Sequence, residues 1–469
     1  MKKINVFIFV IMALLAAALI SCDPNPGSGG KEPDSVETSI VITGDPYVGS
    51  RLGVTITGYA GYDPVWFIGD VRGVQGSSAY TIKEEDIGKM IKVKLLGYDI
   101  NEQEFFLEKE SNAVGPVCRG WSVETIAKYT DNDSARVFQE ARGLAIDSTG
   151  KLYIGANVAY VGWCVAQIDP AVIEESGYAK ATVFAKEGSG GINGAAVRSV
   201  AVGPNDEVYA SLVWGKDRGD GSYILCYEQP GGNIPNWLSG NIFKVLSDAG
   251  VSYADPINGN ILGDIVVDAG GNMYLTVHQW NNYIYIAKVT PQKAVSVFAG
   301  GLKRGEEEDI IGRFSWPPSS TAIDPSGNIY IGDGYHKGMI KKISNSSGTV
   351  TKFAGNDWGD PFVVMGYLSY GRDGNIYVLD RISDDSEWGP IVCKVNSQGE
   401  VTYQIAGNSS VKAYVDGYAA NGNAKFNEPT GIAAGADGTI YVLDWTGEYD
   451  KTSKLYAVRK IWLNTSTTP

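Results

Sequence analysis

The chain has 469 residues, 44% of them apolar, and its formal net charge at pH 7 is −14. An acidic surface repels the phosphates of nucleic acids, so nucleic-acid binding is excluded as an expected function. His278 and His336 are the only histidines, which excludes a three-histidine zinc site within one chain.

Residues 1–21 have the layout of a signal peptide. Lys2 and Lys3 precede an apolar run, Ile4 to Ile20, that is too short for a stable membrane span. Residues 19–22 read Leu-Ile-Ser-Cys, which resembles the lipobox of bacterial lipoproteins. The resemblance implies acylation of Cys22, and several acyl chains anchor firmly because each buried methylene contributes ~0.8 kcal/mol. The alternative is an ordinary secretory signal with a chance cysteine.

Two further segments precede the largest part of the chain. Residues 22–35 are rich in Gly, Pro and Ser, which predicts a flexible tether. Residues 36–117 contain short alternating strands separated by turns, which predict a small β-sandwich. The stretch PVWFIGDVRGVQGSSAYTIKEEDIGKMIKVKLLG resembles Ig-like modules of bacterial surface proteins, including IPT/TIG-type domains. We expect Trp66 in its core and a spacer role for the domain.

Six related segments follow, each typical of a β-hairpin. They are GLAIDSTGKLYIGA (Gly143–Ala156), SVAVGPNDEVYASL (Ser199–Leu212), DIVVDAGGNMYLTV (Asp264–Val277), TAIDPSGNIYIGD (Thr321–Asp333), YLSYGRDGNIYVLD (Tyr367–Asp380) and GIAAGADGTIYVLD (Gly431–Asp444). In each, an alternating apolar strand runs into a turn, and a second strand follows around a tyrosine. The turn glycine supplies positive φ; the second copy has Asp206 there, which tolerates a left-handed backbone.

Most hairpins are followed by two more strand-like runs. The third runs include WCVAQID, YIYIAKV and MIKKIS, and the fourth runs include TVFAK, SVFAG and TKFAG. Four antiparallel strands repeated six times, with no long helical pattern, predict an all-β fold with a six-bladed β-propeller over residues 119–463. The last blade lacks a fourth strand at the C-terminal end. SVETIAK (Ser122–Lys128) is expected to complete it, which would close the ring without an open edge.

The repeats resemble NHL repeats. The best match is AKFNEPTGIAAGADGTIYVLD (Ala424–Asp444), and the first three copies lack the final aspartate of the pattern. The resemblance implies a propeller fold and no particular function. Asp333, Asp380 and Asp444 recur at the ends of second strands, and we expect them to accept backbone N–H bonds.

Catalytic and metal sites have weak support in the sequence. Asp264 begins a first strand, but the corresponding positions in other copies carry Gly, Ser, Thr or Tyr, so the ring is not an acidic cage for calcium. Cys164, Cys226 and Cys393 lie in apolar strand-like runs and are expected to be small buried hydrophobes. We assign no catalytic residue, no metal ligand and no cofactor.

Aromatic residues follow the repeat tyrosines in every copy. They are Trp163, Trp214, Trp280, Tyr335, Trp388 and Trp445. In a propeller these loops share one face, so the six residues predict a binding surface for a glycan or a protein. The alternative is that each ring folds over its own blade as a cap.

The sequence therefore favours a non-enzymatic binding module of the bacterial cell envelope. We expect a lipid-anchored monomer, with the outer membrane as its location, on the periplasmic side or at the cell surface. A calcium-dependent lyase or lactonase-like enzyme in the propeller channel is one alternative. A structural docking component of an envelope complex is another.

Overall fold

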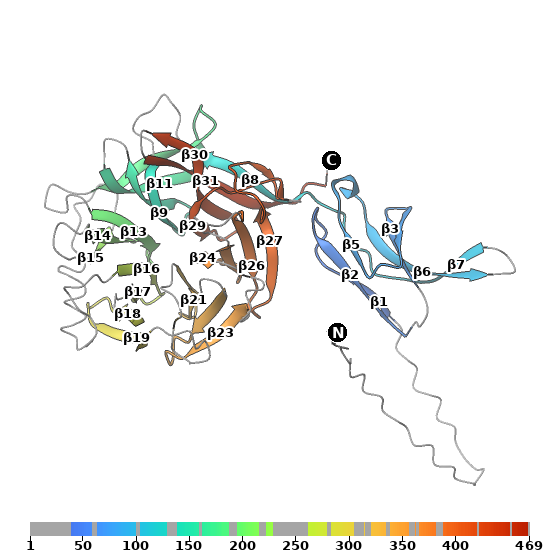
Figure 1. Cartoon of the computed structure of the whole chain (residues 1–469), viewed down its shortest axis with the longest axis horizontal. Coiled ribbons are helices and arrows are strands. Elements are labelled where there is room, and N and C mark those ends of the chain that lie inside the picture. Colours follow the sequence, from blue (N-terminus) through green and yellow to red (C-terminus); the bar gives the residue numbers. More distant parts are fainter. Residues whose placement is uncertain are drawn as a thin grey trace, which may run out of the picture.

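The structure is a computed structural model that describes most of the chain beyond residue 38 (Figure 1). The described residues are 39–58, 63–99, 104–128, 138–158, 162–186, 195–214, 222–227, 261–278, 283–303, 314, 320–333, 338–355, 362, 365–380, 388–419, 422–450 and 453–467. The predicted signal peptide, Cys22 and the tether lie outside them. In these ranges no helix has the length and apolarity needed to cross a membrane.

The N-terminal unit consists of two antiparallel sheets. One contains β1 (Ser39–Thr43), β2 (Arg51–Thr57) and β5 (Ala79–Thr81), and the other contains β4 (Val71–Gln75), β3 (Pro64–Ile68), β6 (Ile91–Asp99) and β7 (Glu104–Glu110). Leu52 of the first sheet and Trp66 and Val93 of the second belong to one buried core. Trp66 is fully buried and donates its indole N–H to the carbonyl of Ser77 at 2.8 Å, which confirms its core position.

The larger unit is a ring of β-sheets, each with its first strand innermost. The first strands are β9 (Phe138–Ile146), β13 (Ala195–Val202), β16 (Ile261–Val267), β20 (Thr321–Ile323), β24 (Met365–Tyr370) and β29 (Pro429–Ala434). Each contacts the next in this order, and β29 contacts β9, so the described first strands form a closed circle (Figure 1).

The outer strands pair antiparallel in chain order, which defines blades 1 to 6. Blade 1 adds β10 (Leu152–Val158), β11 (Gly162–Ile173) and β12 (Ala179–Lys186); blade 2 adds β14 (Val208–Trp214) and β15 (Ser222–Tyr227); blade 3 adds β17 (Met273–His278), β18 (Tyr283–Val289) and β19 (Val295–Lys303). Blade 4 adds β21 (Ile329–Asp333), β22 (Met339–Ile343) and β23 (Val350–Gly355); blade 5 adds β25 (Ile376–Asp380), β26 (Ile391–Val395) and β27 (Val401–Gly407); blade 6 adds β30 (Ile440–Asp450) and β31 (Ser453–Asn464). The structure describes three strands of blade 2, and the segment in which a fourth is predicted lies outside the described residues.

Blade 6 is completed from the other end of the chain. β8 (Gly120–Ala127) pairs antiparallel with β31, with Val123 opposite Ile461 and Glu124 opposite Lys460. The predicted closure by residues 122–128 is therefore confirmed. The short strand β28 (Gly417–Tyr418) pairs with the other edge of β8, so this edge is covered as well.

In several blades the repeat tyrosine donates its hydroxyl to a carboxylate of its hairpin turn. In blade 3, Asp268 Oδ1 accepts the N–H groups of Gly270 and Asn272 at 2.9 and 2.8 Å, and Oδ2 accepts the Tyr274 hydroxyl at 3.1 Å. Blades 1 and 4 repeat this arrangement with Asp147 and Asp324. The turn of blade 2 survives without glycine, since Asp206 has a φ of 63°.

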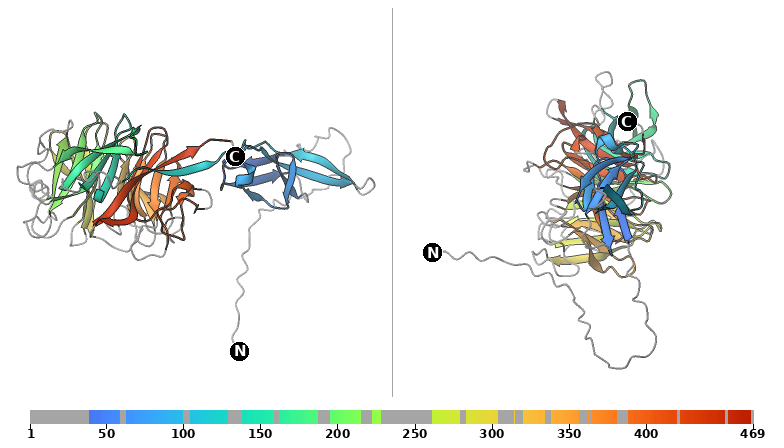
Figure 2. Two further views of the ribbon diagram at one scale, coloured as in Figure 1. Left: turned by 90° about the horizontal axis from the view of Figure 1, so that it is seen from above. Right: turned by 90° about the vertical axis from the view of Figure 1, so that its right-hand side faces the viewer.

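The N-terminal unit projects from the edge of the ring (Figure 2). Cys118 exchanges backbone hydrogen bonds with Pro46 and Val48, and Arg119 N–H donates to the carbonyl of Ser466 at 3.1 Å. Because the unit lies beside the ring, it covers neither end of the central channel (Figures 1 and 2).

Candidate functional site

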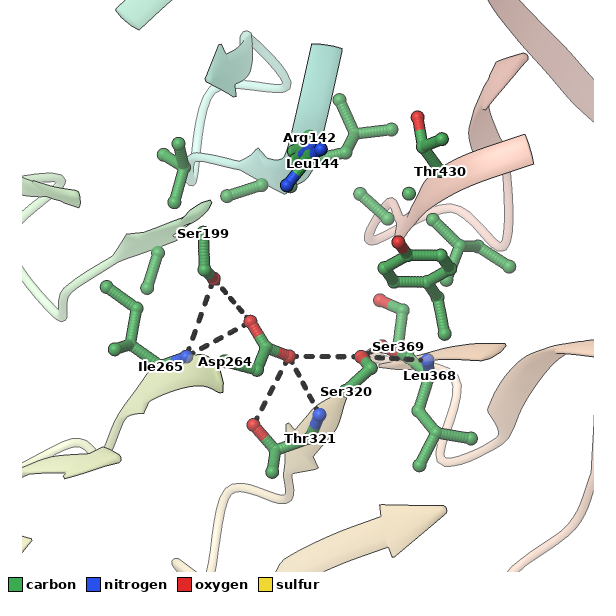
Figure 3. A pocket seen from close by; sticks show the side chains of 18 of the residues that line it. Arg142, Leu144, Ser199, Asp264, Ile265, Ser320, Thr321, Leu368, Ser369 and Thr430 are labelled. Carbon is green, nitrogen blue, oxygen red and sulfur yellow. Dashed lines mark hydrogen bonds between the residues drawn. The ribbon is translucent and has the colours of Figure 1, made fainter. Parts of the chain in front are cut away.

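The channel through the ring contains a cavity of about 730 Å³, lined by the first strands of all six blades (Figure 3). First strands begin, and second strands end, at the same end of the ring. Asn157 lies opposite Glu140 in blade 1, for example, and Asp444 lies opposite Pro429 in blade 6. We call this end the start rim.

Asp264 joins three blades inside the channel. Its Oδ1 accepts hydrogen bonds from the Ser199 hydroxyl of blade 2 and from its own neighbour, the Ile265 N–H, at 3.0 Å. Its Oδ2 accepts the Ser320 hydroxyl at 3.0 Å, the Thr321 N–H at 2.7 Å and the Thr321 hydroxyl at 3.3 Å, all from blade 4 (Figure 3). Withdrawal from bulk water raises the pKa of this carboxyl, and the hydrogen bonds from Ser199, Thr321 and Ser320 act in the opposite direction.

The channel residues do not fit the calcium cage considered as an alternative. Calcium takes six to eight oxygen ligands. Asp264 already has five donors on its two oxygens, and its neighbours in the ring are hydroxyls that donate to it. Across the described ranges, no group of three or more His, Cys, Asp and Glu side chains is placed to hold a metal ion.

The hydrogen bonds of Asp264 belong to a circle that connects every blade to the next. Ser148 N–H donates to Asp206 (blades 1 and 2), Ser199 to Asp264 (2 and 3), Ser320 to Asp264 (3 and 4), Leu368 N–H to Ser320 (4 and 5), Ala434 N–H to Ser369 (5 and 6) and Thr430 to the carbonyl of Ala141 (6 and 1). These polar side chains of the first strands and hairpin turns therefore hold the ring together.

Two arginines enter the same cavity without such partners. Arg142 and Arg198 are exposed cavity-lining residues, and neither guanidinium makes a hydrogen bond or ion pair with a described residue. Desolvation and the charge of Arg142 lower the pKa of Arg198, while Tyr367 and Asp264 raise it. Figure 3 shows Arg142 across the opening from Thr321.

Blade 6 forms an aromatic and charged wall at the start rim. Lys454 Nζ lies 2.5 Å from both carboxylate oxygens of Glu428 and 4.7 Å from the ring centroid of Trp445. The Tyr449 ring, 55% exposed, packs edge-on against Trp445 with centroids 5.2 Å apart, and Tyr449 and Tyr456 line the cavity.

The predicted aromatic residues that the structure describes lie at the start rim, in different environments. Trp163 is opposite Asn157, and Trp214 is opposite Ala195. Trp163 is partly buried against the core shared by blades 1 and 2, and Trp445 against the core shared by blades 6 and 1. Trp445 donates its indole N–H to the carbonyl of Glu448. Trp388 is 48% exposed. The side chain of Trp214, together with Trp280 and Tyr335, lies outside the described residues.

Two of the repeated aspartates have cationic partners that the sequence did not indicate. Asp444 accepts the N–H groups of Asn427 and Glu428, as predicted, and also pairs with the fully buried Arg459 at 3.0 Å. Asp333 pairs with the buried Lys341 at 2.6 Å.

Sequence reasoning missed the arginines of the channel. Arg142 and Arg198, each one residue before the position that corresponds to Asp264, stand out only after the copies are aligned and the direction of each first strand is fixed. The ring of hydroxyl donors had a signal in the sequence, because serine or threonine occurs at this position in blades 2 and 4.

Comparison with known proteins gives similarities in structure alone. No family model matches the chain, and no curated protein matches it, so the NHL, Ig-like and lipoprotein resemblances stay predictions. An auxiliary nutrient binding protein from Bacteroides thetaiotaomicron is similar, with 15% identity, a TM-score of 0.48 and coverage of 91% of this chain and 98% of the other. A second, from Bacteroides ovatus, has 16% identity, a TM-score of 0.42 and coverage of 92% and 99%. The calcium-binding protein regucalcin from Agrobacterium tumefaciens has 14% identity, a TM-score of 0.42 and coverage of 74% and 97%.

Proposed function

We propose that the protein is a non-enzymatic binding module that holds a small polar ligand, such as a mono- or oligosaccharide, in the channel at the start rim. The cavity of about 730 Å³ carries this proposal. Its volume falls within the range of about 300–1,000 Å³ typical of small-molecule sites. Tyr449 and Tyr456 supply ring faces at its wall, and the arginines supply hydrogen-bond donors.

The bonding of Asp264 and Glu428 favours binding over acid–base catalysis at these two residues, whereas Glu140, which also lines the cavity, makes no ion pair with a described cation. A general base needs a free lone pair within reach of the proton that it removes. Both oxygens of Asp264 are engaged by five donors, and both oxygens of Glu428 face Lys454. Holding the ring together therefore accounts for Asp264, and the donors that face the cavity suit ligand capture.

The wider setting is part of the same proposal. Acylation of Cys22 would anchor the chain in the cell envelope, and the tether and the Ig-like unit would hold the NHL-type propeller away from the membrane. The N-terminal unit leaves both ends of the channel uncovered, which suits capture of a ligand from solution (Figure 2).

A ligand panel on the purified full chain tests the proposal. We expect at least one mono- or oligosaccharide to raise the melting temperature, since a ligand at 100 times its Kd stabilises by about 2.7 kcal/mol. Tyr449→Ala should remove most of that shift, because the ring contributes to the cavity wall. Tyr403→Ala, at another exposed tyrosine on the outermost strand of blade 5, is the control and should bind as the unchanged protein does. If the ligand raised the melting temperature of both variants by the same amount, the ligand would bind outside the cavity wall formed by Tyr449.

Protein docking is a second candidate function, favoured by the exposure of Trp388. A large aromatic ring that is 48% exposed at the start rim is the kind of residue that dominates protein interfaces. Trp388→Ala should then abolish capture of an envelope partner and leave saccharide binding unchanged.

A further inference from the structure

Arg142 and Arg198 occupy the same place in neighbouring blades. Each directly precedes the residue at which the two first strands touch: a Cβ added to Gly143 would lie 2.9 Å from the Cα of Ser199 and from the N of Val200. Both first strands begin at the start rim and lie side by side. The two guanidinium groups therefore enter the channel at one level.

In the other blades whose corresponding residue the structure describes, the side chain at this level is small or absent. The corresponding residues of blades 3, 5 and 6 are Gly263, Gly366 and Thr430, two of which have no side chain. Blade 5 stands opposite blade 2 in a ring of six, and its Tyr367 lines the cavity and is electrostatically coupled to Arg198. Space for a ligand group remains in front of the arginines.

The acidic side chains of the cavity do not neutralise this pair. Asp264 has its five donors from the ring, and Glu428 is paired with Lys454. Glu140 lies two residues before Arg142 and is exposed at the start rim, and it makes no ion pair with a described cation. Two like charges held together cost free energy. Asp264 attracts Arg198 electrostatically, but no described residue forms an ion pair with either guanidinium, and an anion in the cavity would supply one.

We infer that Arg142 and Arg198 form an anion site that binds the acidic group of a small ligand, a carboxylate or a phosphate ester, in the channel at the start rim. The guanidinium fork matches both groups because it offers parallel N–H donors. Tyr367, which lines the cavity and is electrostatically coupled to both arginines, places its phenol beside the bound group. This inference rests on the proposed function and names its ligand class as acidic.

The test compares acidic ligands with uncharged counterparts. Titration calorimetry on the full chain uses trigalacturonate and its neutral methyl ester, which share the same sugar backbone and stereochemistry. Glucose 6-phosphate and glucose form the phosphate arm. Arg142→Gln and Arg198→Gln each remove one guanidinium. Arg372→Gln is the matched control, because Arg372 is an exposed arginine in the hairpin turn of blade 5, at the far end of the channel.

We expect an acidic member to bind more tightly than its neutral counterpart. Each channel variant should weaken that binding by about 10- to 100-fold, as expected for loss of a hydrogen bond to a charged group, while Arg372→Gln should not. Arg198→Lys keeps the positive charge but loses the forked pair of N–H donors. Its affinity for the acidic ligand should therefore lie between that of the unchanged protein and that of Arg198→Gln. Binding of trigalacturonate would identify the acidic group as a carboxylate, and binding of glucose 6-phosphate would identify it as a phosphate ester.

Two outcomes overturn the inference. One is equal affinity for the charged and the neutral members together with unchanged binding by both glutamine variants; ligand capture in the channel would then stand without an anion site. The other is that neither acidic member binds at millimolar concentration. The neutral saccharides and Tyr449→Ala then decide the proposed function independently.

Discussion

The carboxylate of Asp264 links three blades through its hydrogen bonds. Its oxygens lie among donors from blades 2, 3 and 4, so its negative charge is spread over five hydrogen bonds instead of facing solvent. Arg142 and Arg198, which line the same cavity, have no such bonds with described residues. The carboxylate therefore links blades of the ring, and the proposed role of the two arginines is to bind a ligand.

Replacing Asp264 with alanine should destabilise the protein strongly. The change leaves several buried donors without an acceptor, and we expect the free energy of unfolding to fall by about 3 kcal/mol. Urea unfolding followed by tryptophan fluorescence measures the loss. Asp437→Ala is the control, because this exposed carboxylate accepts bonds only within its own hairpin turn, from Thr439. If Asp264→Ala lowered the free energy of unfolding no more than the control does, the hydrogen bonds of Asp264 would not stabilise the contacts between blades.

Among the hairpins, the turn carboxylate and the repeat tyrosine act together. Asp147 Oδ1 accepts the N–H groups of Thr149 and Lys151, both at 2.9 Å, and Oδ2 accepts the Tyr153 hydroxyl at 3.0 Å. Burial raises the pKa of Asp147, but these hydrogen bonds and that of the Thr149 hydroxyl outweigh it, and the pKa lies below its usual value. The turn is therefore most stable with the carboxyl ionised.

The sign of this shift predicts a pH-dependent effect of Asp147→Asn. A lowered pKa in the folded state gives stability that is present above the unfolded pKa of about 3.9 and is lost as the pH falls through the folded pKa. At pH 7 we expect the variant to lose about 1–2 kcal/mol of unfolding free energy. The difference from the unchanged protein should shrink as unfolding is measured toward pH 2.5. If the difference in unfolding free energy stayed constant across this pH range, ionisation of Asp147 would not be what stabilises the turn.

The hairpins were predictable from sequence because their determinants are local. Alternating apolar residues, a turn glycine and a tyrosine lie within one short segment, and Asp206 could be recognised as a substitute for glycine. The partners of the repeated aspartates were not predictable. Arg459 reaches Asp444 across two paired strands, and a sequence pattern gives no sign that this arginine is fully buried. The arginine pair of the channel was missed for the same reason, since Arg142 and Arg198 meet only when blades 1 and 2 are packed.

The whole ring depends on β8, whose partner strand comes from the last blade. Val123 on this strand is 2% exposed and packs into the core shared by blades 5 and 6. A ring of blades loses its continuity when one blade opens, because each blade is supported by the two beside it.

Val123→Asp should therefore weaken the whole ring and not one strand alone. Burying an unpaired carboxylate in this core should lower the free energy of unfolding by about 3 kcal/mol or more. Val183→Asp is the matched control, because Val183 lies on β12, the outermost strand of blade 1, and is 41% exposed. Thermal unfolding by circular dichroism should show a large shift for the first variant and a small one for the second. Similar shifts would mean that β8 is dispensable.

The pairing of β8 with β31 also has a consequence for the order of synthesis. β8 is made before every other strand of the ring, and its partner, residues 453–464, is made after all of them. Throughout translation the early strand carries an unsatisfied backbone edge that could pair with a wrong neighbour. The charge of Glu124 on β8 limits that hazard until the last strand arrives.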